Sequence, residues 1–351
     1  MYPAIATIEA LKKKGEFNFM FVGGKYGIEA KIIPQYGIQM KTILISGFQR
    51  YFTWKNILFP FKLILALVQS YKIIHSFKPD VAIGTGGYVS GPVLYVAYKM
   101  GVPVLIQEQD VYPGITTRLL MKYSRKICIA YEEAKHHFQN YLQKVVVTGN
   151  PVRINTEATS KENALNHWNF EKDTPVILIF GGSQGARSIN QAMMAILPRV
   201  QSSVAIQLLW QTGEKEYQTV SSIVHDDGKI KILPYINEMH MAYRAADIII
   251  CRAGAITLAE LTLAEKPVIL IPYPYAAGNH QVQNARMIEQ AGAAIVVTED
   301  PGWYENLYKS LMNLLNDKIL CEKLGSNWSK LARPKAADEI ADEVLALLGN
   351  N

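Results

Sequence analysis

Short apolar runs alternate with longer helix-like stretches along the whole chain, and this alternation limits the fold more than any other feature of the sequence. The runs are rich in Val, Ile and Leu and nearly continuous, which is typical of parallel strands buried on both faces. The predicted strands are Phe17–Val22, Met40–Ile45, Val81–Gly84, Val102–Ile106, Lys126–Ala130, Lys144–Thr148, Val176–Phe180, Ile206–Gln211, Lys229–Leu233, Ile248–Cys251, Val268–Ile271 and Ala293–Val297. The pattern predicts an α/β fold with parallel sheets.

The chain has 351 residues, which suits two domains better than one. The polar stretch 156–173 follows Gly149-Asn150-Pro151, lacks strand character and is interpreted as the linker zone. We therefore predict an N-terminal domain over residues 1–152 and a C-terminal domain over residues 153–334, both Rossmann-like. Residues 335–351 are amphipathic and predict a final helix.

The composition narrows the partners and the compartment. The formal charge of +6 favours an anionic partner, which the charge alone leaves open between nucleic acid, a phosphate-rich substrate and an acidic lipid surface. The three cysteines are sparse and far apart, which favours reduced thiols in a cytoplasmic compartment. No signal peptide is visible, and no apolar run reaches the roughly 20 residues of a membrane-spanning helix. We expect a protein that is soluble or lies on a membrane.

Three glycine-rich turns directly follow predicted strands. They are Gly84–Gly91 after Val81–Gly84, Gly181–Ala186 after Val176–Phe180, and Arg252–Ala255 after Ile248–Cys251. A glycine turn that opens a helix lets backbone N–H groups approach an anion, where the helix dipole also favours negative charge. The second turn lacks the spacing of the dinucleotide-binding fingerprint. Each turn alone is also compatible with a purely structural loop.

Polar residues follow other predicted strands, namely Gln107–Asp110, Gly149–Arg153, and His280-Gln281 with Asn284. Ligands of open α/β sheets bind beyond the carboxyl ends of the strands. These residues together predict a ligand site in a cleft between the two domains.

In this order and spacing, the motifs resemble the MurG family of glycosyltransferases. The matching segments are Tyr2–Ala4, Gly86–Pro92, Glu108-Gln109, Gly149–Arg153, Gly181–Ala186, Arg252–Thr257 and His280-Gln281 with Asn284. The resemblance implies the GT-B architecture and inverting transfer of N-acetylglucosamine from UDP-GlcNAc to lipid I, giving lipid II of peptidoglycan. It implies no cofactor and no bound metal, leaves a divalent cation open, and gives no nucleic-acid partner.

The resemblance also implies the donor residues. Arg153 and Ser183 would meet the diphosphate, Ile236 the uracil, and Gln281 the sugar. The segment that would line the nucleotide, with Glu260 on the ribose hydroxyls, is Ala255, Ile256, Thr257, Leu258, Ala259 and Glu260. Further candidate contacts to donor or acceptor are Gly86, Gly87, Tyr88 and Asp110.

The sequence departs from the family pattern in two places. The first strand and the glycine-rich loop ending in a histidine would precede Tyr2, and with that histidine absent Glu108 is the candidate catalytic residue. Asp110 stands where the family usually has asparagine, and its charge would repel phosphate. We expect a gap between two strands of the N-terminal sheet beside Gly84–Gly91. We also expect that the 351-residue form folds poorly and transfers no sugar.

The segment 48–74 mixes aromatic and basic residues, a combination typical of membrane interfaces. The predicted contacts with an anionic bilayer are Arg50, Phe52, Trp54, Lys55 and Phe59. They place the protein peripherally on the cytoplasmic side of the inner membrane. The later part of this segment is equally compatible with a helix whose apolar face lies in the core.

Two alternative functions remain open from the sequence. One is another enzyme of the same architecture, such as a diacylglycerol glycosyltransferase or a UDP-GlcNAc epimerase. The other is a non-catalytic scaffold at the membrane. The order of the motifs argues against both enzymes, and labelled UDP-GlcNAc offered with either lipid would distinguish the acceptors.

Overall fold

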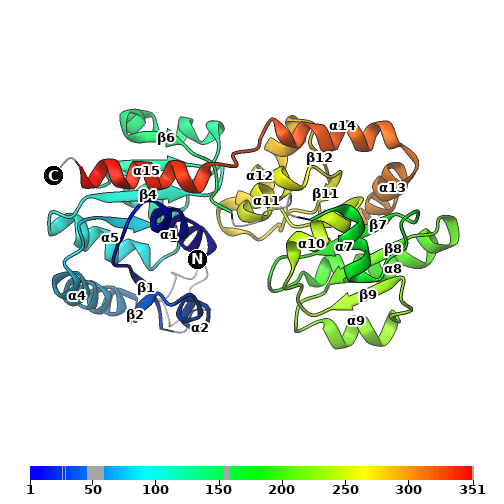
Figure 1. Cartoon of the computed structure of the whole chain (residues 1–351), viewed down its shortest axis with the longest axis horizontal. Coiled ribbons are helices and arrows are strands. Elements are labelled where there is room, and N and C mark those ends of the chain that lie inside the picture. The colour runs from blue at the N-terminus through cyan, green and yellow to red at the C-terminus, as the bar shows by residue number, and fades with distance from the viewer. Residues whose placement is uncertain (26, 28, 46–58, 153–158, 350–351) are drawn as a thin grey trace. The chain divides into compact units, whose positions relative to one another are not determined.

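The computed structural model describes residues 1–25, 27, 29–45, 59–152 and 159–349 (Figure 1). The chain divides into two compact units. Residues 1–152 and 334–351 form unit 1, and residues 153–333 form unit 2. The last helix, α15 (Ala336–Leu348), therefore belongs to unit 1 although it follows unit 2 in the chain.

Unit 1 contains two separate parallel sheets. β1 (Met20–Gly24) pairs with β2 (Gln39–Ile43) in the first. The second has the order β3-β4-β5-β6, from β3 (Ala82–Gly84), β4 (Val104–Glu108), β5 (Lys126–Ile129) and β6 (Val145–Val147). The helical segments of this unit are α1 (Tyr2–Lys14), α2 (Glu29–Ile32), η1 (Ile33–Tyr36), α4 (Phe59–Phe77), α5 (Ser90–Lys99), α6 (Ile115–Leu120), η2 (Glu132–Lys144) and α15.

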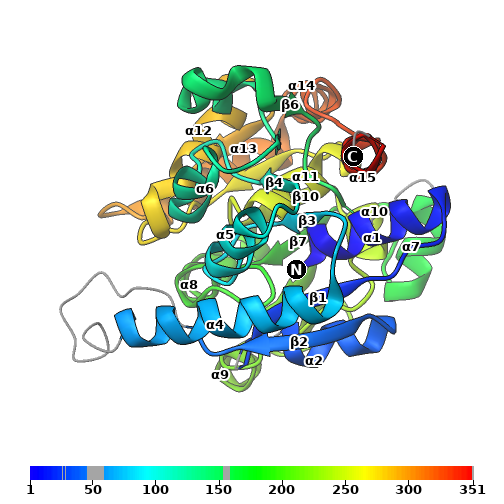
Figure 2. The ribbon, with the colours of Figure 1, turned by 90° about the vertical axis from the view of Figure 1, so that its left-hand side faces the viewer.

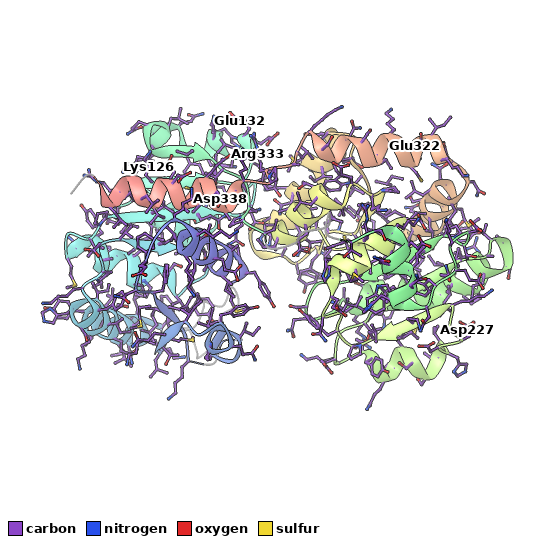
Figure 3. All side chains as sticks on the ribbon, in the orientation of Figure 1. Lys126, Glu132, Asp227, Glu322, Arg333 and Asp338 are labelled. Atoms are coloured by element: carbon purple, nitrogen blue, oxygen red, sulfur yellow. The ribbon has the colours of Figure 1, made fainter. Side chains whose placement is uncertain are left out.

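Helices cover both faces of the four-stranded sheet in unit 1 (Figure 2). On one face, α1 and α15 pack on each other and share a core with Leu105 of β4 and Cys128 of β5. On the other face, α4, α5 and α6 pack around Val104 and Ile106. Lys126 of β5 forms an ion pair with Glu343 of α15 at 2.8 Å, and Lys126 lies along that helix in Figure 3. Burial of an Ile or Leu side chain stabilises a fold by roughly 1.5–3 kcal/mol, so the core that α15 shares with α1, β4 and β5 holds it on unit 1.

The break between the two sheets lies where the sequence predicts a gap. Among the described residues, no strand joins β1 to β3, so each is an edge strand. A Cβ built on Gly24, the last residue of β1, would lie 3.9 Å from the hydroxyl of Tyr88 in the Gly84–Gly91 turn. The predicted interruption beside that turn is therefore confirmed. The expected loss of folding and activity is the alternative to a working transferase, and it would appear as binding of UDP without transfer of sugar.

Unit 2 has one parallel six-stranded sheet with the order β12-β11-β10-β7-β8-β9. Its strands are β7 (Val176–Phe180), β8 (Gln207–Gln211), β9 (Ile230–Leu233), β10 (Ile248–Cys251), β11 (Val268–Leu270) and β12 (Ala294–Val296). Its helical segments are α7 (Lys161–Trp168), α8 (Arg187–Ser203), α9 (Tyr217–Ile223), α10 (Met239–Ala245), α11 (Ala255–Ala264), η3 (Ala277–Asn279), α12 (His280–Gln290), α13 (Trp303–Asn316) and α14 (Lys318–Ser329).

The strand order of unit 2 reverses between β7 and β10. The chain runs outward from β7 through β8 to β9, then crosses to the other side of β7 and runs outward from β10 to β12. Open parallel sheets bind ligands at such a switch point, beyond the carboxyl ends of the strands. Ile177 and Ile179 of β7 face α8 and α13 in the main core, whereas Phe180 packs on Tyr243 of α10 on the other face.

All the predicted strands are present, with ends that differ by up to three residues, and the α/β prediction is confirmed. The largest shift is at the first strand, predicted at Phe17 and observed from Met20. The predicted linker zone 156–173 contains helix α7, which the Ser160 side chain caps by accepting a hydrogen bond from the Asn163 N–H at 3.1 Å. None of the described helices has the length and apolar character that crossing a membrane requires.

Candidate functional site

The turn Gly181–Ala186 joins β7 to α8 at the switch point of unit 2. Gly182 and Gly185 have φ values of 85° and 73°, which only glycine adopts without strain. A Cβ on Gly185 would lie 2.0 Å from the carbonyl oxygen of Thr212, so the turn packs directly on the chain that leaves β8. Ser183, at its tip, is exposed. The turn thus holds Ser183 and the start of α8 at the sheet edge, and the N-terminus of a helix is a place where backbone N–H groups can bind an anion.

Buried polar side chains hold this turn in place. The Gln211 side-chain amide donates to the Gly182 carbonyl at 2.9 Å and accepts from the Ile236 N–H at 2.8 Å. Asn190 of α8 donates to the Thr212 carbonyl at 2.9 Å and accepts from the Trp210 indole at 3.0 Å. Since buried polar groups cost about 1–3 kcal/mol when left without a partner, these contacts restrict where the loops after β7, β8 and β9 can lie.

Arg252, the residue after β10, forms a buried ion pair with Glu299 at 2.5 Å. The guanidinium also donates to the Ser188 hydroxyl at 2.8 Å and to the Ile271 carbonyl at 3.0 Å. Ser188 in turn donates to Glu299 at 2.7 Å. The network ties the first turn of α8 to the ends of three strands. Because its partners are protein groups, Arg252 has a positioning role at the sheet edge.

Helix α11 begins at Ala255 without a side-chain cap hydrogen bond. Glu260 lies on its second turn, where the carboxylate Oε2 accepts a hydrogen bond from the hydroxyl of buried Tyr243 at 2.8 Å. Part of the Glu260 side chain reaches the surface. Burial raises the pKa of Glu260 to about 7, although the hydrogen bond from Tyr243 acts in the opposite direction. When it is ionised, this carboxylate can accept hydrogen bonds from the two hydroxyls of a diol.

The other predicted donor residues of unit 2 lie at the same edge of the sheet. The side chain of Gln281 accepts from the Tyr273 N–H at 2.9 Å, so it holds the chain that leaves β11. Ile236 is 2% exposed and Leu258 is fully buried, so both side chains belong to the core. Contact of either with a nucleotide would therefore involve the backbone or a small part of the side chain. Ala255 is also buried, whereas Ile256, Thr257 and Ala259 are partly exposed.

Glu108 ends β4 in unit 1, and its carboxylate is held by the loop that follows. Oε1 accepts from the N–H groups of Gln109 and Asp110 at 2.9 and 3.2 Å, and Oε2 accepts from the Gly114 N–H at 3.0 Å. Burial raises the pKa of Glu108, partly offset by hydrogen bonds that include one from Thr117. The geometry is that of a clamp on residues 109–114.

The glycine turn of unit 1 differs from that of unit 2. Gly86 and Gly87 have φ values of 84° and 79°, and nothing lies within 4 Å of a Cβ built on Gly87. The Gln109 side chain donates to the Thr85 carbonyl at 2.7 Å, which joins this turn to the loop after β4. Tyr88 is 47% exposed. Gly86, Gly87, Tyr88 and the Glu108–Asp110 segment therefore lie at one edge of unit 1.

Comparisons with known proteins agree over almost the whole chain. Residues 1–129 match the glycosyltransferase family 28 N-terminal domain, and residues 176–340 match the glycosyltransferase family 28 C-terminal domain. The chain belongs to glycosyltransferase family 28.

Curated relatives in this family are similar along nearly their full length. The chain is 41% identical over 346 residues to the UDP-N-acetylglucosamine–N-acetylmuramyl-(pentapeptide) pyrophosphoryl-undecaprenol N-acetylglucosamine transferase of Thermoanaerobacter sp., covering 97% of this chain and 94% of the relative. The protein of that name from Christiangramia forsetii is 40% identical, covering 100% and 95%. The crystal structure of Acinetobacter baumannii MurG superposes with a TM-score of 0.77 at 26% identity, covering 98% of this chain and 95% of that one. The resemblance to the MurG family is confirmed, and the two units are the Rossmann-like domains of a GT-B glycosyltransferase.

Most of the predicted membrane contacts and one predicted donor residue fall outside the described part of the chain. Arg153, Arg50, Phe52, Trp54 and Lys55 lie outside the described residues, and Phe59 is the partly exposed first residue of α4. Within the described ranges, no group of three or more His, Cys, Asp or Glu side chains is arranged to hold a metal ion.

The sequence reasoning missed Tyr243, Gln211 and the partners of Arg252. Tyr243 lies in a short helix with no motif around it, and only its burial beside Glu260 reveals it. Gln211 ends an apolar strand and is buried in the structure. The signal available in the sequence was a polar residue at the end of an apolar run. Glu299 and Ser188 lie far from Arg252 in sequence, and only the order of the strands brings them together.

Proposed function

We propose that this chain transfers N-acetylglucosamine from UDP-GlcNAc to the lipid-linked acceptor lipid I, producing lipid II with inversion at the anomeric carbon. The main support is the curated relatives, which are about 40% identical over nearly the whole chain and carry the name of that transferase. The arrangement of unit 2 fits the donor, because the switch point brings glycine turns and a carboxylate to one edge of the sheet.

The donor is proposed to bind across the carboxyl ends of β7 and β10. Its diphosphate would lie at the Gly181–Ala186 turn beside Ser183, where the N-terminus of α8 favours negative charge. Its ribose hydroxyls would donate to Glu260, and its sugar would meet Gln281. Arg153 would add a positive charge to the diphosphate. During transfer the same turn would stabilise the charge that develops on the departing UDP.

The acceptor hydroxyl must lose a proton as it attacks the sugar, and Glu108 is the proposed base. Its raised pKa suits that task. Its hydrogen bonds to the 109–114 loop also allow a purely structural role, since both carboxylate oxygens already accept N–H groups.

The variant Glu108→Gln separates these roles. A lost base lowers the transfer rate by roughly 100-fold or more and leaves UDP affinity unchanged, because the donor is proposed to bind unit 2. Exposed Glu133→Gln in the same unit is the control. Wild-type transfer by Glu108→Gln would exclude the base. A lost rate that returns when the assay is cooled below a lowered melting temperature would assign Glu108 to the loop alone.

The acceptor is tested directly by competition between lipids. Radiolabelled UDP-GlcNAc is incubated with the protein and either lipid I or diacylglycerol in detergent. We expect label in the lipid I product alone. Label in diacylglycerol would make the chain a transferase of the same fold with another acceptor. Binding of UDP without transfer to either lipid would contradict the proposed reaction.

We further propose that unit 1 docks peripherally on the anionic cytoplasmic face of the inner membrane, which is where a lipid-linked acceptor lies. Helix α4 exposes a row of apolar side chains at helical spacing, namely Phe61, Ile64, Leu65, Val68 and Tyr71, with exposed fractions of 43–71%. Lys72 of the same helix is exposed. The next two helices, α5 and α6, add Tyr98, Ile115 and Leu119. Apolar side chains beside basic ones are typical of interfacial helices.

Vesicle co-sedimentation tests this docking. The double variant Ile64→Ser, Val68→Ser should bind vesicles containing phosphatidylglycerol more weakly than wild type, and added salt should weaken both. Ile319→Ser, which changes an 80% exposed side chain of unit 2, is the matched control. Equal sedimentation of the double variant and the control would contradict the proposal for α4.

A further inference from the structure

Tyr243 connects two parts of the donor site in unit 2. Its side chain is fully buried, and its ring packs edge-on against Phe180 with centroids 5.9 Å apart. Phe180 is the last residue of β7, directly before the glycine turn. At the other end of the ring, the hydroxyl donates to Glu260 Oε2 at 2.8 Å. One side chain therefore contacts both the strand that carries the proposed diphosphate site and the carboxylate proposed for the ribose.

The hydrogen bond uses one carboxylate oxygen and leaves the other available. Among the described residues, Oε1 of Glu260 has no hydrogen-bond or ion-pair partner, and the side chain is partly exposed. A glutamate side chain on a helix has several rotamers, and fixing it in one of them costs conformational entropy. A donor fixed on Oε2 orders the carboxylate before the ligand arrives, so that cost is not taken from the binding free energy.

A role in the core alone does not account for this pair. A buried tyrosine hydroxyl needs a partner, but phenylalanine would fill the same space without one. Burying a carboxylate beside it costs further free energy, and burial holds the pKa of Glu260 near 7. Perturbed carboxylates of this kind gather at functional sites. The free-energy cost of burying the Glu260 carboxylate is accounted for if the pair presents one carboxylate oxygen to a ligand.

We propose that Tyr243 is a positioning residue for the sugar-nucleotide donor: its hydroxyl holds Glu260 Oε2 so that Oε1 meets the ribose hydroxyls. The inference rests on the proposed function of unit 2 and deepens it, because it names the residue that prepares the carboxylate. Tyr243 acts through Glu260 and does not touch the nucleotide. The ligand feature it serves is the ribose diol, and not the base or the diphosphate.

The test compares UDP with 2′,3′-dideoxy-UDP by calorimetry on the full chain. Wild type should prefer UDP by roughly tenfold or more, since a carboxylate loses its diol partners in the dideoxy ligand. Tyr243→Phe keeps the ring and removes the hydroxyl. It should weaken UDP binding several-fold and dideoxy-UDP binding little, so that the preference falls toward that of Glu260→Gln. Tyr308→Phe, in which a ring of α13 that contacts Arg199 of α8 loses its hydroxyl, is the matched control and should keep the wild-type preference.

Each outcome has a distinct meaning. A Tyr243→Phe variant with the full wild-type preference would overturn the proposal, as would equal weakening of both ligands, which is what general damage to unit 2 produces. A wild type that binds both ligands equally would instead remove Glu260 from the ribose site. A wild type that binds neither would refute the proposed donor site itself. Additivity of Tyr243→Phe and Glu260→Gln in the double variant would also contradict the inference, because residues that act as a unit are not additive.

Discussion

Unit 2 pairs its strands in one six-stranded sheet, whereas unit 1 divides its strands between a two-stranded and a four-stranded sheet. Both units are built from the same alternation of strand and helix, and helices cover both faces of each main sheet. The difference lies at one position. In unit 2 the central strands β7 and β10 pair with each other, while in unit 1 the strands β1 and β3 have no pairing between them.

The glycine turns beside these strands also differ, because one is closely packed and the other is not. In unit 2, Gly185 and Gly213 lie against each other's chains, and a Cβ on either would approach a backbone oxygen to 2.0–2.3 Å. In unit 1, Gly87 has open space around it. The turn of unit 2 is thus part of the packed fold, and the turn of unit 1 stands at an open sheet edge. In this chain the complete sheet of unit 2 packs closely around its glycine turn, whereas the interrupted sheet of unit 1 leaves space around Gly87.

Hydrogen exchange should show the largest difference between the units. Lys25 donates to Ile43 and Ala82 to Pro103, so the alternation of a parallel ladder turns the N–H groups of Val22 and Ile83 toward the open edges. Leu178 of β7 lies between two paired strands. Because edge amides open locally and central ones open only with the whole unit, Val22 and Ile83 should exchange roughly a thousandfold faster than Leu178. Equal protection, measured by mass spectrometry or NMR, would mean that another segment fills the gap.

The strands of both units were predictable because each is a short apolar run bounded by turn residues, as with Val176–Phe180 and Ile248–Cys251, whose ends agree with the structure. The pairing of strands was not predictable from periodicity. Val22 and Ile83 look like any buried strand residue, and the break between them was expected only from the family resemblance. The polar stretch before β7 concealed α7, because its helix signal is a single Ser160 cap.

Two glycine substitutions test whether close packing of the turn in unit 2 contributes to the stability of that unit. Gly185→Ala puts a methyl group 2.0 Å from the Thr212 carbonyl oxygen at a φ of 73°, so we expect unit 2 to lose at least about 3 kcal/mol of stability and UDP affinity to fall with it. Gly182→Ala in the same turn has a φ of 85° but open space, and should cost only about 1–2 kcal/mol. Denaturant unfolding and calorimetry measure both effects.

The glycine of unit 1 extends the same test. Gly87→Ala, at a φ of 79° and with no atom within 4 Å, should resemble Gly182→Ala in stability and leave UDP affinity unchanged. Equal losses in Gly185→Ala and Gly87→Ala would show that packing does not distinguish the two turns.

The edge that carries the site was also predictable in part. Ser183, Glu260 and Gln281 follow strands, and a parallel sheet necessarily brings such residues to one edge. The partners of these residues were hidden, because hydrogen bonds such as Gln211 to Gly182 and Tyr243 to Glu260 depend on the strand order and on side-chain burial. Leu258 shows what the motif does not reveal: it is a predicted donor residue, and its side chain lies wholly in the core.

The smallest expected effect is a pH dependence of donor binding that belongs to unit 2 alone. Burial raises the pKa of Glu260 from the ordinary 4.5 to about 7. The free energy of unfolding of the donor-free protein therefore falls as the pH rises through that range, because the folded state holds a proton that the unfolded state has already released. Ribose hydroxyls donate to the ionised carboxylate, so binding favours ionisation and releases a proton below pH 7. Affinity for UDP-GlcNAc should therefore rise about tenfold between roughly pH 6 and 8 and then level.

UDP-GlcNAc is the right ligand for this measurement. The terminal phosphate of UDP has a pKa of about 6, so its own titration would add to the pH dependence of the measured affinity. The ionisable neighbours of Glu260 are Tyr243 and Cys251, whose pKa values burial raises further above neutrality, so neither titrates in this window. Glu260→Gln should flatten the profile, and Tyr243→Phe should move its midpoint upward, since the lost hydrogen bond lowers the pKa of Glu260 in the wild type. Calorimetry in two buffers of different ionisation enthalpy would show the released proton directly. A flat wild-type profile, or an unchanged slope in Glu260→Gln, would separate the raised pKa from donor binding.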